Sequence, residues 1–414
     1  MTPDAGAQAA FQPIAVAQRI HALDVVRGFA LLGIFLMNIE WFTRPVQAMG
    51  SGIDPSATGV DHAAAWLVYV FVQGKFWVLF SLLFGMGFAV MASRGGHGPG
   101  FRQAYLRRCL WLGVFGVLHG VLLWSGDILH AYAVAGLLLL AFGEIGNRAR
   151  LWLGLGLYLA LAGLFVFGGG LLSLVPLEAM PELAATADAS DARAAASAQV
   201  YAHGDYGQVT RQRALDFGMI VLQGSMMVVP MALGVFMLGA WLVRSGRMHD
   251  IVAQRGWFAR LAAWTIPLGL AFVALATRVG TGFDGMREMG PVMLAGGLMF
   301  LGSLPLALGY LSLLMLGLGV PGLSRVLSWL APAGRMALTN YLLQSLVAST
   351  LFYGYGFALW GQVGRAGQVL LVFALFAAQV VASRWWLARY RFGPMEWLWR
   401  WLTYRQRPPM RLAA

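Results

Sequence analysis

Long apolar runs alternate along the chain with short segments that are rich in Arg, Gly and Pro. A helix that crosses a bilayer needs about 20 mainly apolar residues. By that criterion the sequence predicts an all-α, polytopic membrane protein with about ten transmembrane helices. The predicted helices cover residues 24–42, 63–92, 107–125, 128–143, 151–176, 215–243, 261–278, 291–319, 336–357 and 366–386.

Some of these segments are longer than one perpendicular crossing requires. Gly74 divides the second segment, which allows its first part to lie at the membrane interface. Pro230 and Pro305 fall inside the sixth and eighth segments, and a proline inside a helix predicts a kink.

The composition excludes a soluble protein. Hydrophobic residues make up 59% of the chain and charged residues 11%, whereas soluble domains carry about 45–50% apolar and about 25% charged residues. The single cysteine, Cys109, excludes an intrachain disulfide and a metal site built on cysteines. The sequence contains no P-loop and no His-Glu-x-x-His motif, so we expect neither a P-loop ATPase nor a zinc site, and no metal.

The net charge of +12 is explained by topology. With a cytoplasmic N-terminus and alternating helices, most of the 29 Lys and Arg residues fall on the cytoplasmic side and most of the 17 acidic residues fall outside. This is the positive-inside pattern of membrane proteins. It predicts that both termini are cytoplasmic and that the basic side contacts membrane lipids. It also excludes nucleic acid as a partner.

The chain divides along its length at changes in composition. The segment 177–214 is Ala-rich and mildly acidic, and it is either a lid over an outward-facing cavity or a passive extracytoplasmic connector. The C-terminal tail carries Trp and Arg in the pattern of an amphipathic helix at a membrane surface. The predicted parts are a disordered N-terminus (1–18), an N-terminal membrane bundle (19–176), the connector (177–214), a C-terminal membrane bundle (215–390) and an interfacial tail (391–414).

Polar residues inside membrane helices are costly and therefore informative. Asp24 and Arg27 are three residues apart on the first helix and can pair. Asn38 follows Arg27 by about 16 Å of helix and shares its face. These residues either face a binding cavity or form a helix-end ion pair with a structural amide.

A second polar group lies at the end of the third predicted helix. Arg108 and His119 share a helix face, and Asp127 and His130 follow at the next turn. A carboxylate that orients an imidazole makes it a general base. The same pair could instead be a buried polar contact that fixes a helical hairpin.

Three further residue groups are candidates. Lys75, the only lysine, is either a binding charge within the membrane or a side chain that reaches the headgroups. Arg335, Asn340 and Gln344 place several hydrogen-bonding groups on the ninth predicted helix. They indicate either a polar cavity or a helix interface.

Several stretches together resemble the YeiB-type family of bacterial inner-membrane proteins, with its C-terminal domain of unknown function. The resemblance implies a multi-pass protein of the bacterial inner membrane. It rests on Leu23-Asp24-Val25-Val26-Arg27-Gly28, Lys75-Phe76, Leu79 to Gly85, His119-Gly120, Trp124, Gly126-Asp127-Ile128-Leu129, Gly334-Arg335-Met336-Ala337-Leu338-Thr339-Asn340-Tyr341 and Gly393-Pro394 with Glu396-Trp397-Leu398-Trp399-Arg400.

The start of the chain also resembles, more distantly, transmembrane acyltransferases of the heparan glucosaminide N-acetyltransferase type. That resemblance implies transfer of an acyl group from cytoplasmic acyl-CoA to an extracytoplasmic saccharide or other envelope acceptor. It implies that Arg27 faces the CoA phosphates and that Asn38 lies near the acyl path. The histidine of those enzymes lies in the loop after the first helix, where this chain has only His62 at a different spacing.

Two hypotheses follow. In an acyltransferase, His119 is the general base and Asp127 orients it, Lys75 or Asn38 stabilises the oxyanion, and Arg27, Arg108 and Arg335 attract the anionic donor. In a non-catalytic transporter or lipid- or small-solute-binding protein, the same charges only bind. The small-residue faces of the helices allow a homodimer in either case.

Overall fold

The computed structural model describes residues 21–95, 98–248 and 250–412. The predicted disordered segment 1–18 lies outside these residues. The described part of the chain is helical and contains no β-strand, which confirms the all-α class. Its α-helices are α1 (His21–Asn38), α2 (Gly59–Phe71), α3 (Lys75–Gly95), α4 (Pro99–Leu122), α5 (Leu129–Ala141), α6 (Asn147–Leu172), α7 (Pro181–His203), α8 (Tyr206–Met219), α9 (Ser225–Arg244), α10 (Arg255–Val279), α11 (Met289–Leu318), α12 (Pro321–Leu327), α13 (Ala331–Arg335), α14 (Ala337–Phe352), α15 (Arg365–Leu387) and α16 (Pro394–Tyr404).

A helix is present in each of the ten predicted segments. The second segment is broken into α2 and α3 at Gly74, whose φ of +82° is accessible to glycine at little cost. The sixth segment contains the end of α8, a π-helical turn (Ile220–Gly224) and α9. The ninth segment contains α14, and the short α13 ends directly before it, because the chain leaves helical geometry at Met336.

Seven stretches of the described chain are long and apolar enough to cross a membrane. They include α1, α6, α10, α11 and α15, together with the α2–α3 and α8–α9 pairs. This agrees with a polytopic membrane protein. The helix α5 is apolar but shorter, and α14 has 16 residues, so the count of about ten crossings stays a prediction.

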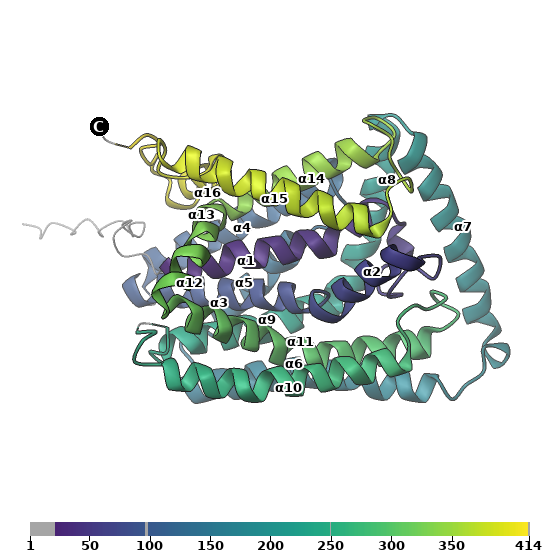
Figure 1. Ribbon diagram of the computed structural model, residues 1–414, viewed down its shortest axis with the longest axis horizontal. Coiled ribbons are helices and arrows are strands. Elements are labelled where there is room, and N and C mark those ends of the chain that lie inside the picture. Colours follow the sequence, from purple (N-terminus) through teal and green to yellow (C-terminus); the bar gives the residue numbers. More distant parts are fainter. Residues whose placement is uncertain (1–20, 96–97, 249, 413–414) are drawn as a thin grey trace, which may run out of the picture.

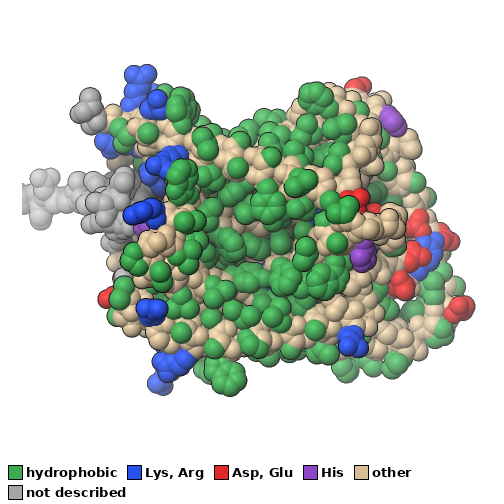
Figure 2. Space-filling model, in the orientation of Figure 1, with side chains coloured by type: hydrophobic (Ala, Val, Ile, Leu, Met, Phe, Trp, Pro, Cys, Tyr) green, Lys and Arg blue, Asp and Glu red, His purple; other side chains and the backbone are tan. Residues whose placement is uncertain are grey.

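The long helices lie side by side along one axis of the bundle, and the two ends of the bundle differ in charge. Figure 1 shows α12, α13 and α16 at one end and α7 lying across the other. In Figure 2, Lys and Arg gather at the first end and Asp and Glu at the second. We call these the basic end and the acidic end. The start of α1 and the helix α16 near the end of the chain both lie at the basic end (Figure 1), and the cytoplasmic location of the two termini remains a prediction.

The helix α1 lies in the middle of the bundle and contacts α3, α13, α14 and α15. Two glycines allow its close approach to the α12–α13 region. A Cβ atom on Gly28 would lie 2.2 Å from the Leu330 carbonyl oxygen, and one on Gly334 would lie 1.9 Å from the Asp24 carbonyl oxygen. The backbone of residues 330–335 is thereby held directly against α1.

Helices from both halves of the sequence pack against one another. The helix α9 contacts α3, α5 and α6, and α11 contacts α6 as well as α10. The connector predicted at 177–214 contains α7 and the start of α8. Near the C-terminus, α16 contacts α4 and α14.

Candidate functional site

A cavity of about 270 Å³ lies between α1, α3, α4, α5, α14 and α16. Its lining combines arginines with many aliphatic and aromatic side chains. Its arginines are Arg27, Arg108, Arg335 and Arg400. Its apolar walls include Leu31, Ile34, Phe80, Leu83, Phe84, Leu112, Ile128, Leu129, Tyr132 and Tyr341. A cavity with this lining suits a ligand with an anionic head and a less polar arm.

The four predicted charges Asp24, Arg27, Arg108 and Arg335 all border this cavity, although they come from three separate parts of the chain. The Arg27 Nη1 atom donates to Asp24 Oδ1 at 2.7 Å, as their spacing predicted. Among the described residues, neither Arg108 nor Arg335 forms an ion pair with a carboxylate. No carboxylate of the described residues therefore neutralises their positive charges.

Glu396 on α16 is a further cavity residue, and its carboxylate is turned toward the start of α14. It accepts hydrogen bonds from the backbone N–H groups of Leu338 (2.7 Å) and Thr339 (3.1 Å) and from the Thr339 hydroxyl (2.6 Å). A carboxylate is favourable at a helix N-terminus, where these N–H groups have no partner within the helix. Burial raises the pKa of the Glu396 carboxyl, and this outweighs the hydrogen bonds from Thr339 and Leu338, which lower it.

The predicted pair His119 and Asp127 meets at the turn between α4 and α5. The His119 Nδ1 atom lies 2.8 Å from Asp127 Oδ2, and both side chains are buried. Gly116 makes room for this contact, because a Cβ there would lie 2.7 Å from Asp127 Oδ1 and 2.5 Å from the His130 nitrogen. Since an ionised carboxylate only accepts, Nδ1 carries the proton and Nε2 is the basic nitrogen.

His119 lies directly behind the cavity wall. Its ring packs against that of Tyr341, a cavity residue, with centroids 4.9 Å apart. The cavity residues Ile128 and Leu129 directly follow Asp127 in the chain. The Nε2 atom of His119 is buried and has no hydrogen-bond partner in the described part of the chain. A ligand group that reached His119 Nε2 past Tyr341 would meet a basic nitrogen that is oriented by Asp127 and free to accept a proton.

The Asp127 carboxylate also contacts a second imidazole, that of His130. Its Oδ1 atom accepts from the His130 backbone N–H at 3.1 Å and lies 3.4 Å from His130 Nδ1. The other ring nitrogen of His130 lies 3.4 Å from the Ser225 hydroxyl, next to the π-helical turn. Both oxygens of Asp127 are thus fixed, which orients His119.

Besides His119 and Asp127, four predicted site residues do not border the cavity. Lys75 is fully buried, and its Nζ donates to the Tyr69 carbonyl oxygen (3.2 Å) and to Met299 Sδ (2.9 Å). Asn38 is buried at the other end of α1 from Arg27. Asn340 and Gln344 instead join α14 to α15, as the second of their two interpretations expected.

The α14–α15 contact is a chain of amide hydrogen bonds. The Asn340 side chain donates to the Ser383 hydroxyl at 2.9 Å, and Gln344 donates to Gln379 at 2.9 Å. Gln379 in turn donates to the Asn340 carbonyl oxygen at 3.0 Å. These groups satisfy one another, so they stabilise the helix interface.

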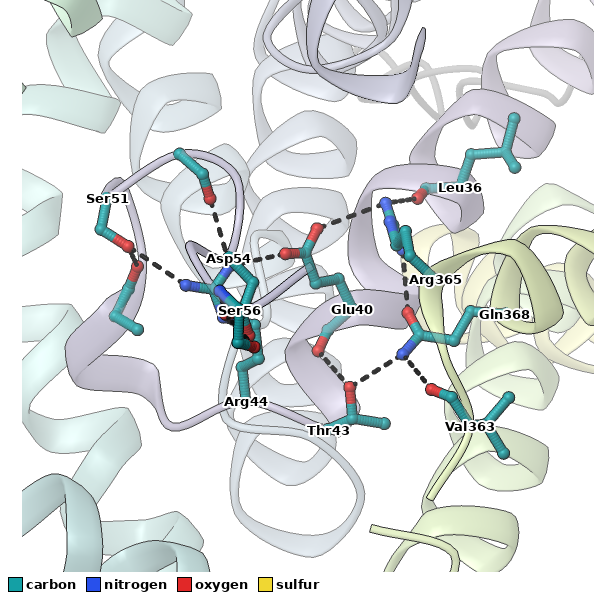
Figure 3. A network of polar contacts seen from close by, with 12 residues as sticks. Leu36, Glu40, Thr43, Arg44, Ser51, Asp54, Ser56, Val363, Arg365 and Gln368 are labelled. Carbon is teal, nitrogen blue, oxygen red and sulfur yellow. Dashed lines mark hydrogen bonds and ion pairs between the residues drawn. The ribbon is translucent and has the colours of Figure 1, made fainter. Parts of the chain in front are cut away.

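A polar network at the acidic end was not predicted from the sequence. Figure 3 shows Glu40 between two arginines, with its carboxylate 2.6 Å from Arg44 and 3.3 Å from Arg365. Arg365 also donates to Gln368 (3.0 Å) and to the Leu36 carbonyl oxygen (2.9 Å). The network joins the end of α1 to the start of α15. In the sequence its only signal was the presence of charged residues at the ends of two predicted helices, Glu40 in 24–42 and Arg365 directly before 366–386.

One residue of the cavity was also missed. Trp399 was assigned to the membrane surface, but it borders the cavity and stacks on Arg108.

No group of three or more His, Cys, Asp or Glu side chains that could hold a metal ion occurs within residues 21–95, 98–248 and 250–412.

Comparison with known proteins identifies the family. YxaH of Bacillus subtilis is 31% identical over 96% of this chain and 98% of its own. YeiB of Escherichia coli is 32% identical over 95% of this chain and 98% of its own. The chain belongs to the YeiB family. A Bacillus acidopullulyticus relative, a 39.9 kDa protein in an amylase 3' region, is 29% identical over 97% of this chain and 98% of its own.

All three YeiB-family relatives are described as uncharacterized. Residues 242–406 also match the family model of a protein of unknown function, DUF418. This segment runs from the end of α9 through α16. The YeiB family is thus established for this membrane protein, and its activity has to be inferred from the site.

Proposed function

We propose that this YeiB-family protein is a bacterial inner-membrane transferase that moves an acyl group from cytoplasmic acyl-CoA to an extracytoplasmic saccharide or other envelope acceptor. One observation carries the proposal. One cavity is bordered by Arg108 and Arg335, which form no ion pair among the described residues, and also by Tyr341, whose ring packs on that of His119 in the His119–Asp127 pair. The basic end would face the cytoplasm, in keeping with the positive-inside pattern.

The donor would lie along this cavity. Arg108 and Arg335 bind its phosphates, and the arm with the thioester extends along the apolar walls toward Tyr341. The acceptor, an alcohol or amine, approaches from the acidic end. Its oxygen or nitrogen attacks the thioester carbonyl carbon, and the carbon–sulfur bond breaks. His119 Nε2 takes the proton of the acceptor and passes it to the CoA sulfur, while Asp127 holds the imidazolium.

A second hypothesis is supported by a different observation. His119 is only 2% exposed, and its side chain does not itself border the cavity. A transporter or a lipid- or small-solute-binding protein would use the cavity and its arginines without any proton transfer. In that case the His119–Asp127 pair fixes the α4–α5 turn.

Transfer across the membrane separates these hypotheses. Inverted vesicles that contain the protein receive acetyl-CoA labelled on the acyl group, and label is measured on material inside the vesicles. We expect label transfer to be lost in His119→Gln and Asp127→Asn, while calorimetric binding of CoA to the purified variants is retained. Arg108→Ala should lose CoA binding, and Arg148→Ala, an exposed basic-end residue outside the cavity, should not.

If CoA binds but His119→Gln transfers label normally, the assignment of the base is wrong. If CoA does not bind at millimolar concentration, the acyltransferase proposal fails and the second hypothesis stands.

A further inference from the structure

Trp399 on α16 holds Arg108 on α4 in two ways. The guanidinium carbon of Arg108 lies 3.6 Å from the centroid of the indole, a close cation–π contact. The indole Nε1–H of Trp399 also donates to the carbonyl oxygen of Arg108 at 2.9 Å. One aromatic residue thus fixes both the backbone and the charged group of the same arginine, although they are 291 residues apart in the sequence.

This arrangement leaves the hydrogen-bond donors of Arg108 free. Within the described residues, its guanidinium makes no ion pair and no hydrogen bond to the protein, and it borders the cavity. By contrast, Arg27 in the same cavity is bound to Asp24. An arginine held by its planar face keeps its N–H groups available along its edge, in the geometry that matches a phosphate.

The charge balance of the cavity also favours an anion. Four arginines border it against two carboxylates. Asp24 is occupied by Arg27, and Glu396 by the start of α14. The described residues therefore supply no anion to Arg108, and a doubly charged group such as a phosphate would do so.

We propose that Arg108, oriented by Trp399, is a preformed phosphate-binding site for the head of an amphiphilic ligand whose arm enters the cavity. The choice of CoA as the first ligand rests on the proposed function. The site itself would equally accept the phosphate of an anionic phospholipid, because the chemistry is the same. In this arrangement α16, a helix near the C-terminal end of the sequence, determines how Arg108 on α4 recognises a phosphate.

The docking of α16 is well supported by other contacts. The Arg107 Nε atom donates to the Thr403 carbonyl oxygen at 2.8 Å, and the Met395 backbone N–H donates to the Thr339 hydroxyl at 3.1 Å. Glu396 adds its three hydrogen bonds to α14. Removal of the Trp399 ring alone should therefore leave α16 in place.

The test compares two tryptophans of α16. Trp399→Leu removes the stacking face. Trp397→Leu is the matched control, because Trp397 donates to the Pro408 carbonyl oxygen and does not border the cavity. Binding to the purified proteins in nanodiscs is measured for CoA and for pantetheine, which lacks the phosphates. Nanodiscs that contain phosphatidic acid, with lipid retention measured by native mass spectrometry, test the lipid source.

We expect Trp399→Leu to weaken CoA binding by about 5- to 30-fold, with Trp399→Phe in between, since a desolvated cation–π contact contributes on this scale. Pantetheine binding should be unchanged, and Trp397→Leu should bind like the wild type. Arg108→Lys should behave like Trp399→Leu, because an ammonium cannot stack as a plane.

Equal weakening of CoA and pantetheine by Trp399→Leu would mean a structural role and would overturn the proposal, as would unchanged CoA binding. If the wild type retains phosphatidic acid but not CoA, and this retention depends on Trp399, the phosphate site at Arg108 is supported. The acyl-CoA donor of the proposed function is then wrong. If neither is bound, the phosphate site is wrong, whatever the outcome of the label-transfer experiment.

Discussion

His119 and Asp127 form a buried hydrogen bond of 2.8 Å across the turn that joins two antiparallel helices. The contact depends on a residue that takes no part in it. Gly116 lies one turn before His119, and the start of α5 occupies the space where a side chain would be. The packing of a glycine on α4 thus determines the distance between a base and the carboxylate that orients it.

Breaking this pair from either side should destabilise the fold. Asp127→Ala leaves the buried Nδ1–H of His119 unsatisfied and frees the start of α5, so we expect a loss of about 1–3 kcal/mol in the free energy of unfolding. His119→Ala should cost a similar amount. The double variant should cost less than the sum, because no unpaired partner remains. Denaturant unfolding in detergent measures all three, and strictly additive losses would contradict the coupling.

Gly334→Ala should separate α13 from α1. The new methyl group would lie 1.9 Å from the Asp24 carbonyl oxygen, so the backbone has to move. We expect a loss of about 1–3 kcal/mol and weaker CoA binding, since Asp24 and Arg335 both border the cavity. Gly156→Ala on α6 is the control, because a Cβ there meets nothing within 4 Å. A normal melting temperature for Gly334→Ala would show that this contact is looser than described.

Stability should depend on pH through Glu396. Burial raises the pKa of this carboxyl above its ordinary value, so above about pH 4.3 the native state retains a proton that the unfolded state has released. Stability therefore falls as the pH rises toward the native pKa. The melting temperatures of the wild type and Glu396→Gln, measured from pH 4 to 8, should diverge as the pH rises, with the wild type falling more. Parallel curves would mean that Glu396 does not titrate in this range.

Lys75→Met should be tolerated. The ammonium is fully buried, and within residues 21–95, 98–248 and 250–412 its partners are a carbonyl oxygen and a thioether. A buried charge without a counter-ion is costly. Methionine keeps much of the shape of the side chain, so the free energy of unfolding should not fall, and CoA binding should be unchanged. If CoA or phosphatidic acid binding is lost instead, Lys75 belongs to the site after all.

The sequence predicts the positions of the helices well because apolar length is a local property that a bilayer requires of each segment. It also predicts the Asp24–Arg27 pair and the His119–Asp127 pair, whose members are close in the chain. It does not predict that Asn340 and Gln344 face α15, because their partners Ser383 and Gln379 belong to another helix. Either interpretation of those amides was compatible with their spacing.

The role of α16 was missed for a related reason. Its Trp and Arg residues have the composition of a membrane-surface helix, and nothing in the local pattern distinguishes Trp399 from Trp397. Only the packing of α16 on α4 places one of them on Arg108 and leaves the other outside the cavity. Contacts between residues hundreds of positions apart are not encoded in any single segment.

The cavity is built from residues on both sides of the boundary at which the DUF418 match begins. Residues 242–406, the region that the DUF418 model matches, contribute α13, α14 and α16 to its walls, whereas α1, α3, α4 and α5 lie before that region. Expressed alone, this region would present Arg335 and Trp399 without Arg27, Arg108 or the His119–Asp127 pair. In evolutionary terms, neither part can exchange partners freely, because each contributes walls to the same cavity.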